Sequence, residues 1–253
     1  MNLLLRRDTE MAANVSQVDS AILGLKREFE VIAHNLANVG TTGYKRRCNA
    51  FAQCLAGLNG DADAETGRAV DLLTNFDFSQ GSIVETGRSL DFALSGRGFF
   101  VIETPDGPLY TRNGTFHLDR NGHIADSAGR MVAGESGPIT IPPDVGLSQI
   151  SVSDDGQIRA GNTLIGRFEL VDFGQDEKKL LAAGSSCFSA PQNLRSRPVE
   201  NLIVKQGFKE ASNVKPVEEL VDMMMVSRLY EANMQLISAG KDNSKSILNV
   251  AMS

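Results

Sequence analysis

The chain has 253 residues, with 25 Lys and Arg against 31 Asp and Glu, which gives a formal net charge of −6 at pH 7. This balance provides no general electrostatic attraction to nucleic acid, and no nucleic-acid partner is expected. The 42% hydrophobic content predicts a packed core, and three cysteines do not make a disulfide framework. No run approaches the roughly 20 apolar residues of a membrane helix, so membrane insertion is not expected.

The first strong pattern is a helix from Val15 to Asn38. Its apolar residues recur alternately every three and four positions, which is a heptad seam. Gly40 and Gly43 follow and are expected to end the helix, since glycine tolerates the left-handed conformation. Asn35 and Asn38 share one face and are expected to bind a neighbouring molecule or the outgoing chain. The seam itself consists of Val15, Val18, Ile22, Leu25, Phe29, Ile32 and Leu36.

Residues 46–75 are interpreted as a linker or extended segment. The stretch from Leu58 to Val70 is polar and contains several Gly and Asp residues, which is typical of a connecting segment. The basic cluster Tyr44–Arg47 lies at its start. We expect this cluster to be solvated charge or a patch that pairs with an acidic neighbour.

Residues 76–206 are predicted to form a central all-β domain of hairpins. Asp-Gly or Asn-Gly pairs at 106–107, 121–122 and 155–156 separate short apolar or alternating runs. Such pairs are the strongest short-range signal for a hairpin turn. The segments expected to be strands are residues 99–102, 115–118, 150–152 and 168–171.

Several motifs in this region resemble ligand sites, but a simpler structural reading is favoured for each. Ser95–Phe100 has two glycines and no third, so a tight turn into a buried strand is expected, not a phosphate loop. Asp119–Gly122 lacks the further oxygen ligands of a calcium loop, which favours a hairpin turn. His117 and His123 have no third ligand at metal-binding spacing. We therefore predict no catalytic residue, no metal ligand and no cofactor, and expect that the protein is not an enzyme.

The C-terminal segment, residues 207–253, returns to a helical pattern. Ser212 or Asn213 is the expected N-cap, and Pro216 lies near the first turn. Further apolar residues widen the stripe, and a helix this apolar must bury more than one side. The apolar positions singled out are Leu220, Met223, Met224, Tyr230, Met234, Ile237 and Leu248.

These patterns predict an α+β protein. The N- and C-terminal helices are expected to pair as a coiled-coil-like domain, with the all-β domain between them. The expected parts are an extra N-terminal tail (1–10), the N-terminal helix (11–45), the linker (46–75), the β domain (76–206) and the C-terminal helix (207–253).

The width of the C-terminal stripe favours packing against neighbouring subunits over an intramolecular coiled coil alone. Each terminal helix presents one apolar stripe, and an isolated helix of this kind gains little without a partner. The predicted assembly interface is Val15, Val18, Ile22, Leu25, Phe29, Ile32, Asn35, Leu36, Asn38, Leu220, Met223, Met224, Tyr230, Met234, Ile237 and Leu248.

Three ordered blocks resemble the flagellar rod and hook axial family. They are AHNLANVGTTGYKRR (33–47), the stretch Asp77–Ile124 and the stretch Gln206–Ile237. Within the family, DFSQG, LDFAL and GESGPITIP look most like a proximal rod subunit. A distal rod or hook-family protein is the alternative. His34 departs from the usual Asn, and the family start aligns with Met11, so either Met11 is the true start or residues 1–10 are a short extra tail.

The resemblance implies a structural subunit of the bacterial flagellar basal-body rod. Its terminal helices would polymerise into the inner layer of a periplasmic drive shaft that transmits torque to the hook. Implied partners are proximal and distal rod subunits, copies of the chain itself and the flagellar type III export apparatus, with export from the cytoplasm without a Sec signal. The competing class is a β-fold carbohydrate-binding or hydrolytic protein with helical dimerisation arms, which requires a concave site with convergent acids or aromatics.

Overall fold

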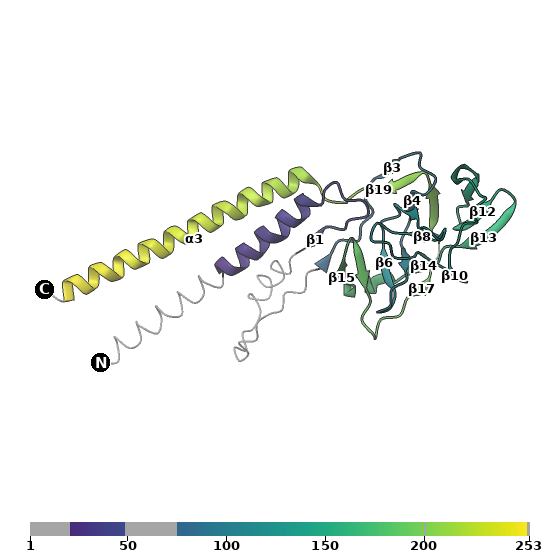
Figure 1. The fold of residues 1–253 in the computed structure, drawn as a ribbon. Helices are drawn as coiled ribbons and strands as arrows, with labels where there is room; N and C mark the ends of the chain where they lie inside the picture. The colour runs from purple at the N-terminus through teal and green to yellow at the C-terminus, as the bar shows by residue number, and fades with distance from the viewer. Residues whose placement is uncertain (1–20, 49–74, 200, 252–253) are drawn as a thin grey trace. The chain divides into compact units, whose positions relative to one another are not determined.

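The computed structural model describes residues 21–48, 75–199 and 201–251, with side chains up to residue 239. The described residues fall into a helical unit (21–36, 47–48 and 215–251) and a β unit (37–46, 75–199 and 201–214). The expected α+β class, with a largely β centre and helices toward both ends, is confirmed (Figure 1). Residues 37–46 and 207–214 belong to the β unit, whereas the sequence pattern placed 37–45 and 207–214 in the helical segments and residue 46 in the linker.

The helical unit contains a helix over residues 21–37 and the long helix α3, Pro216–Ala251. Leu25 and Ile32, one heptad apart, form a small buried cluster with Val226 of α3, and Met223 packs against it. Pro216 is the first residue of α3, where its fixed φ and missing N–H cost nothing. The short strand β1, Arg47–Cys48, also belongs to this unit. Among the described residues, no helix has both the length and the apolarity to cross a membrane.

The β unit is built from short antiparallel strands. The largest sheet has the order β15-β16-β6-β5-β14-β17, a second has the order β11-β12-β13, and two-stranded ribbons join β9 to β10, β7 to β8, β4 to β18 and β3 to β19. The bounds are β2 Asn75–Phe76, β3 Ile83–Glu85, β4 Phe92–Ser95, β5 Phe99–Ile102, β6 Leu109–Thr111, β7 His117–Leu118, β8 Ile124–Ala125, β9 Ala133–Gly134, β10 Gly137–Pro138, β11 Ile150–Val152, β12 Gln157–Ala160, β13 Thr163–Arg167, β14 Leu170–Asp172, β15 Leu181–Gly184, β16 Cys187–Ser189, β17 Arg197–Pro198, β18 Ile203–Gln206 and β19 Phe208–Glu210. Short 3-10 turns lie at Leu147–Gln149 and Gly174–Lys179.

Strand β5 separates two apolar cores. Because successive side chains of a strand point to opposite faces, Phe100 and Ile102 enter one core while Phe99 and Val101 enter the other. This explains why the run is uniformly apolar and buried along its whole length. Aromatic rings meet largely edge to face within the cores, as Phe100 and Phe116 do at 5.3 Å between centroids.

The turn motifs adopt the structural roles expected for them. Gly96 and Gly98 both have positive φ and lie between β4 and the buried β5. Gly122 (φ 83°) turns the β7–β8 ribbon, and the Asp119 carboxylate accepts hydrogen bonds from the backbone N–H groups of Asn121 and His123, both at 2.8 Å. The Asp119 carboxylate is therefore engaged in holding the turn.

Candidate assembly surface

The most exposed apolar surface of the helical unit lies along α3. Nine of its apolar side chains are between 42% and 73% exposed, whereas Met223 and Ile237 are half-buried and Val226 is 8% exposed. Only one edge of the helix is therefore buried by the described chain. The exposed apolar residues of α3 are Val217, Leu220, Val221, Met224, Met225, Leu229, Tyr230, Met234 and Leu236.

A groove runs between the helix over residues 21–37 and α3. It has a volume of about 300 Å³, and its lining includes the aromatic residues Phe29 and Tyr230, which are 41% and 42% exposed. Leu25 and Val226 form its floor where the small helical cluster begins. An open groove with aromatic walls at the seam of two helices is suited to receive an apolar side chain.

The predicted interface residues divide into three groups by exposure. Leu25, Ile32 and Asn35 are buried within the chain. Half-buried positions are Ile22, Leu36, Asn38, Met223 and Ile237, and exposed positions are Phe29, Leu220, Met224, Tyr230 and Met234. Val15 and Val18, and the side chain of Leu248, lie outside the described residues. Participation of all sixteen in assembly stays a prediction.

Asn35 binds the outgoing chain, one of the two roles expected for it. Its side-chain oxygen accepts a hydrogen bond from the backbone N–H of Arg47 at 2.8 Å, and its amide donates to the Arg47 carbonyl at 3.0 Å. The amide also donates to the Glu219 carboxylate in the first turn of α3 at 3.3 Å. Asn35 and Glu219 are both fully buried. One residue thus connects the first helix, the segment that follows it and the start of α3.

A polar turn follows the first helix over residues 38–43, and we call it the hook. Local hydrogen bonds and the positive φ of one glycine hold its conformation. The Thr41 N–H donates to the Asn38 carbonyl at 3.1 Å, and the Thr41 hydroxyl donates to the Asn38 side chain at 3.1 Å. Gly43 has φ of 66°, and a Cβ there would overlap the backbone of Asn113. The expectation for Gly40 is wrong, because this residue does not adopt positive φ and has open space around it. The hook therefore depends on Gly43.

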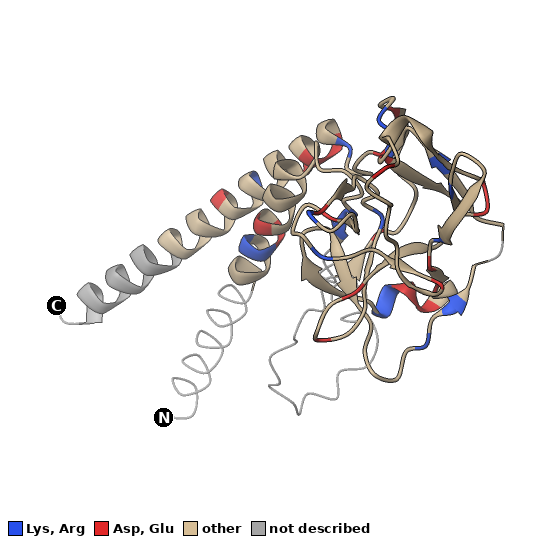
Figure 2. Ribbon diagram, turned by 45° about the vertical axis from the view of Figure 1, so that its right-hand side comes forward, with Lys and Arg blue, Asp and Glu red and all other residues tan. Residues whose placement is uncertain are grey.

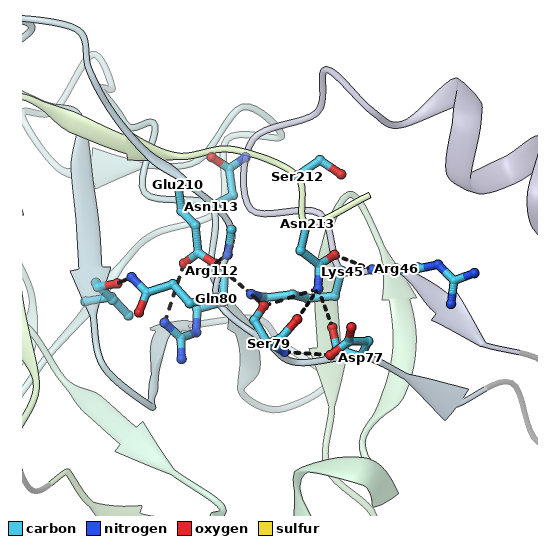
Figure 3. Close-up of polar contacts among 12 residues, drawn as sticks. Lys45, Arg46, Asp77, Ser79, Gln80, Arg112, Asn113, Glu210, Ser212 and Asn213 are labelled. Atoms are coloured by element: carbon cyan, nitrogen blue, oxygen red, sulfur yellow. Dashed lines mark hydrogen bonds and ion pairs between the residues drawn. The ribbon is translucent and has the colours of Figure 1, made fainter. Parts of the chain in front are cut away.

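Beyond the hook, Lys45 enters the interior of the β unit (Figure 3). Its ammonium lies 2.6 Å from the Glu210 carboxylate and donates to the Ser79 carbonyl at 2.7 Å, and Lys45 and Glu210 have fully buried side chains. Arg112 meets the second oxygen of Glu210 at 3.4 Å, and the Gly81 N–H donates to the first at 3.0 Å. We call Lys45, Arg112 and Glu210 the buried charge cluster.

Burial and ion pairing have opposite effects on the pKa values of the two basic side chains in this cluster. Burial lowers the pKa of Lys45, and the Glu210 carboxylate opposes that shift. Burial likewise lowers the pKa of Arg112, again opposed by Glu210. Since the guanidinium keeps its charge at any ordinary pH, Glu210 always has one cationic partner. Breaking such a buried pair by removing one member is far more costly than losing a surface pair.

Asn213 joins the incoming and outgoing segments of the β unit beside this cluster (Figure 3). Its side-chain oxygen accepts a hydrogen bond from the Arg46 N–H at 2.7 Å. Its amide donates to the Asp77 carbonyl at 2.8 Å and to the Ser79 carbonyl at 3.1 Å. Because α3 begins at Pro216 and this side chain is engaged elsewhere, the expectation that Asn213 caps the helix is wrong.

The buried charge cluster is the feature that the sequence pattern did not indicate. Tyr44–Arg47 was expected to be solvated charge or a patch pairing with an acidic neighbour, yet Tyr44 and Lys45 are 6% and 1% exposed. The partner, Glu210, lies 165 positions away in the chain, so no local spacing reveals the pair. Lys45 lies two residues after Gly43, but a glycine at a turn does not by itself predict a buried neighbour.

The described residues do not assemble a recognisable reaction centre. Within them, no group of three or more His, Cys, Asp and Glu side chains is placed to hold a metal ion. His123 lies 3.0 Å from the Asp119 carboxylate of its own turn. His117 is exposed, and burial lowers the pKa of His34.

Comparison with known proteins identifies the family. Residues 93–160 match the model of the flagellar hook protein FlgE/F/G D1 domain, and residues 205–250 match that of the flagellar basal body rod FlgEFG protein C-terminal region. The chain is 31% identical to the flagellar basal-body rod protein FlgF of Caulobacter vibrioides, covering 88% of this chain and 91% of that protein.

Two further relatives agree with this assignment. The flagellar basal-body rod protein FlgG of Buchnera aphidicola subsp. Schizaphis graminum is 33% identical, over 82% of this chain and 88% of its own length. FlgF of Salmonella typhimurium is 31% identical, over 84% and 88% respectively. With matches of this identity over most of its length, the chain belongs to the family of flagellar basal-body rod proteins.

Proposed function

We propose that the chain is a structural subunit of the flagellar basal-body rod, and that it polymerises through its two terminal helices. The names of its relatives support the first part of the proposal. The second part rests on one observation: apolar side chains lie exposed around α3 on more sides than the first helix covers.

The charge pattern of α3 also supports an assembly surface on this helix. The charged residues of α3 whose side chains are described lie between Glu218 and Glu231, and beyond them Figure 2 shows a stretch of ribbon coloured for neither acidic nor basic residues. From Ala232 to Gly240 the sequence has no charged residue at all. An apolar surface of this extent is uncommon on a monomer and marks an interaction site.

Burial against copies of the chain or against related rod subunits provides the apolar contacts that the single chain lacks around α3. The apolar area removed from water contributes roughly 25 cal/mol per Å², which offsets the entropy lost when the helices become ordered. A head-to-tail contact that does not close on itself produces a helical tube instead of a ring. In this proposal, the tube is the periplasmic rod that transmits torque to the hook.

Partners and location follow from the same proposal. The partners are proximal and distal rod subunits, further copies of the chain and the type III export apparatus, and the site is the basal body outside the cytoplasm. The sequence blocks favour a proximal over a distal subunit.

Two matched substitutions test this proposal in a strain that lacks the gene. Leu229 on α3 is 54% exposed, and Leu164 on β13 of the β unit is 57% exposed. Leu229→Glu is expected to abolish motility and leave motor rings without rod or hook in electron micrographs, because it charges the assembly surface. Leu164→Glu adds the same charge to an equally exposed leucine and is expected to restore motility.

The readouts distinguish assembly from folding and export. Circular dichroism of both purified variants is expected to match the parent, because neither leucine is buried. Immunoblots of the exported fraction are expected to contain Leu229→Glu protein that has not entered basal bodies. Normal rods with Leu229→Glu, or equal failure of both variants, would contradict an assembly role for α3.

A further inference from the structure

A pocket in the β unit, remote in sequence from both terminal helices, carries an uncompensated negative charge. It has a volume of about 440 Å³. Glu103 follows the end of β5, Glu169 immediately precedes β14, and Tyr110 of β6 lies across from Val101 of β5. The remaining lining residues are Val101, Thr104, Gly107, Pro108 and Ser196.

The two carboxylates of the pocket lack cationic partners among the described residues. Burial raises the pKa of Glu169, and the carboxylates of Glu103 and Glu135 raise it further. Glu135 pairs with Arg167 at 3.4 Å, but neither Glu103 nor Glu169 has an ion pair with any described side chain. Glu103 and Glu169 are half-buried at this pocket, and a carboxylate whose pKa is raised by burial and by neighbouring like charge marks a candidate binding site.

Tyr110 adds a hydrogen-bonding group of fixed orientation to the pocket. The residue is only 7% exposed and belongs to the second apolar core, yet its hydroxyl has no hydrogen-bond partner among the described residues. The ring packs edge to face on Phe173 at 4.8 Å, which fixes its orientation. The ring is buried, but the phenol oxygen is not enclosed by protein, and at the pocket it can hydrogen-bond a group that enters.

We propose that this pocket binds an arginine side chain presented by a partner protein, with the guanidinium between Glu103 and Glu169 and against Tyr110. A guanidinium donates in a planar fork that matches carboxylates, and it stacks on aromatic rings. The occupant brings the positive charge that the pocket lacks.

Two alternatives are less compatible with the residues present. A metal ion requires a denser ligand set, and no suitable group of three carboxylates, histidines or cysteines occurs among the described residues. The chain's own Arg195 and Arg197 flank the lining residue Ser196, but neither forms an ion pair with a pocket carboxylate in the described structure. The proposal concerns the β unit alone and does not depend on the role assigned to the terminal helices.

The experiment uses the full-length chain labelled with ¹³C at the glutamate carboxyl carbons. N-acetyl-arginine N-methylamide is titrated in and followed by NMR, with the neutral isostere N-acetyl-citrulline N-methylamide in parallel. We expect the Glu103 and Glu169 signals to shift and saturate with the arginine compound, and the pKa of Glu169 to fall when it is bound. The citrulline compound is expected to bind at least about tenfold more weakly, since it lacks the charge.

Variants identify the pocket as the site of binding. Glu169→Gln is expected to weaken binding of the arginine compound at least about tenfold. Tyr110→Phe is expected to weaken this binding severalfold while the variant retains its fold. Glu85→Gln, which removes an exposed carboxylate of β3 outside the pocket, is expected to bind as the parent does. Equal binding of the two compounds, no saturable shift, or a stronger response to calcium chloride than to the arginine compound would each overturn the proposal.

Discussion

At the scale of single residues, the charged side chains in the interior of the β unit have the largest expected effect on stability. Lys45 and Glu210 form a buried pair at 2.6 Å, whereas Lys179 and Asp176 form a surface pair at 2.7 Å. The two distances are nearly the same, but only the second pair is strongly solvated. Burial, not distance, therefore decides which pair matters for stability.

Replacing Lys45 tests this difference. Lys45→Met leaves the Glu210 carboxylate buried with Arg112 at 3.4 Å as its remaining cationic partner. We expect the free energy of unfolding to fall by about 3–5 kcal/mol, measured by urea denaturation. Lys179→Met is the matched control and is expected to change it by about 1 kcal/mol or less. Losses of the same small size in both variants would show that the buried charge cluster contributes little.

Glu169 provides a prediction about pH. Burial, Glu103 and Glu135 raise its pKa, so the folded state binds this proton more tightly than the unfolded state, whose value is near 4.5. Ionisation at neutral pH therefore opposes folding, and stability is lost as pH rises through the folded pKa. Glu169→Gln is expected to raise the melting temperature at pH 7 and to lose this advantage below pH 4.5. A destabilised variant, or a gain independent of pH, would contradict the assignment.

At the scale of elements, the hook after the first helix is the decisive connection. It redirects the chain from the helix over residues 21–37 into the β unit, where the Gly43 N–H donates to the Glu210 carbonyl at 2.8 Å. The same segment then contributes Lys45 to the buried charge cluster. Three features therefore hold residues 43–45 in place. They are the positive φ of Gly43, its hydrogen bond to the Glu210 carbonyl and the Lys45–Glu210 ion pair.

Two glycines of the hook make a matched comparison. Gly43→Ala places a Cβ against the backbone of Asn113 at φ of 66°, while Gly40→Ala points into open space. The strained φ alone costs about 1–3 kcal/mol, and the overlap adds to it. Thermal denaturation is expected to show a clear loss for Gly43→Ala and little change for Gly40→Ala. Equal melting temperatures would mean that the hook rearranges freely.

Local chemistry explains how far the elements were predictable. Gly122 and Gly156 mark turns because Asp-Gly and Asn-Gly pairs act through their own backbone, and both glycines have positive φ. Ser212 or Asn213 was expected to cap α3 because the local pattern fits, yet Asn213 binds Arg46, Asp77 and Ser79 instead. Such contacts join segments far apart in sequence, and no local spacing encodes them.

At the scale of the whole molecule, the two units differ in how much they bury. The β unit has two apolar cores and the buried charge cluster. The helical unit has one small described cluster, Leu25, Ile32 and Val226, against a long exposed stripe on α3. The β unit therefore contains the interactions of an independent fold, and under the proposed function the helical unit is completed by further subunits.

Truncation separates the two units. A chain without Met1–Asn38 and Val217–Ser253 retains Lys45, Glu210 and Asn213 together with both apolar cores. We expect it to be a soluble monomer in analytical ultracentrifugation, with a single cooperative thermal transition. Aggregation of the truncated chain, or the absence of a cooperative transition, would show that the β unit depends on the helices for its fold.

The most direct test of assembly through the helices is methionine oxidation of free chain and of isolated basal bodies, quantified by mass spectrometry. Met224 and Met225 are each 55% exposed, and half-buried Met131 of the β unit serves as the internal reference. The account predicts that both helical methionines oxidise readily in the free chain and become strongly protected in basal bodies relative to Met131. Equal oxidation of Met224 and Met225 in the two samples would contradict it.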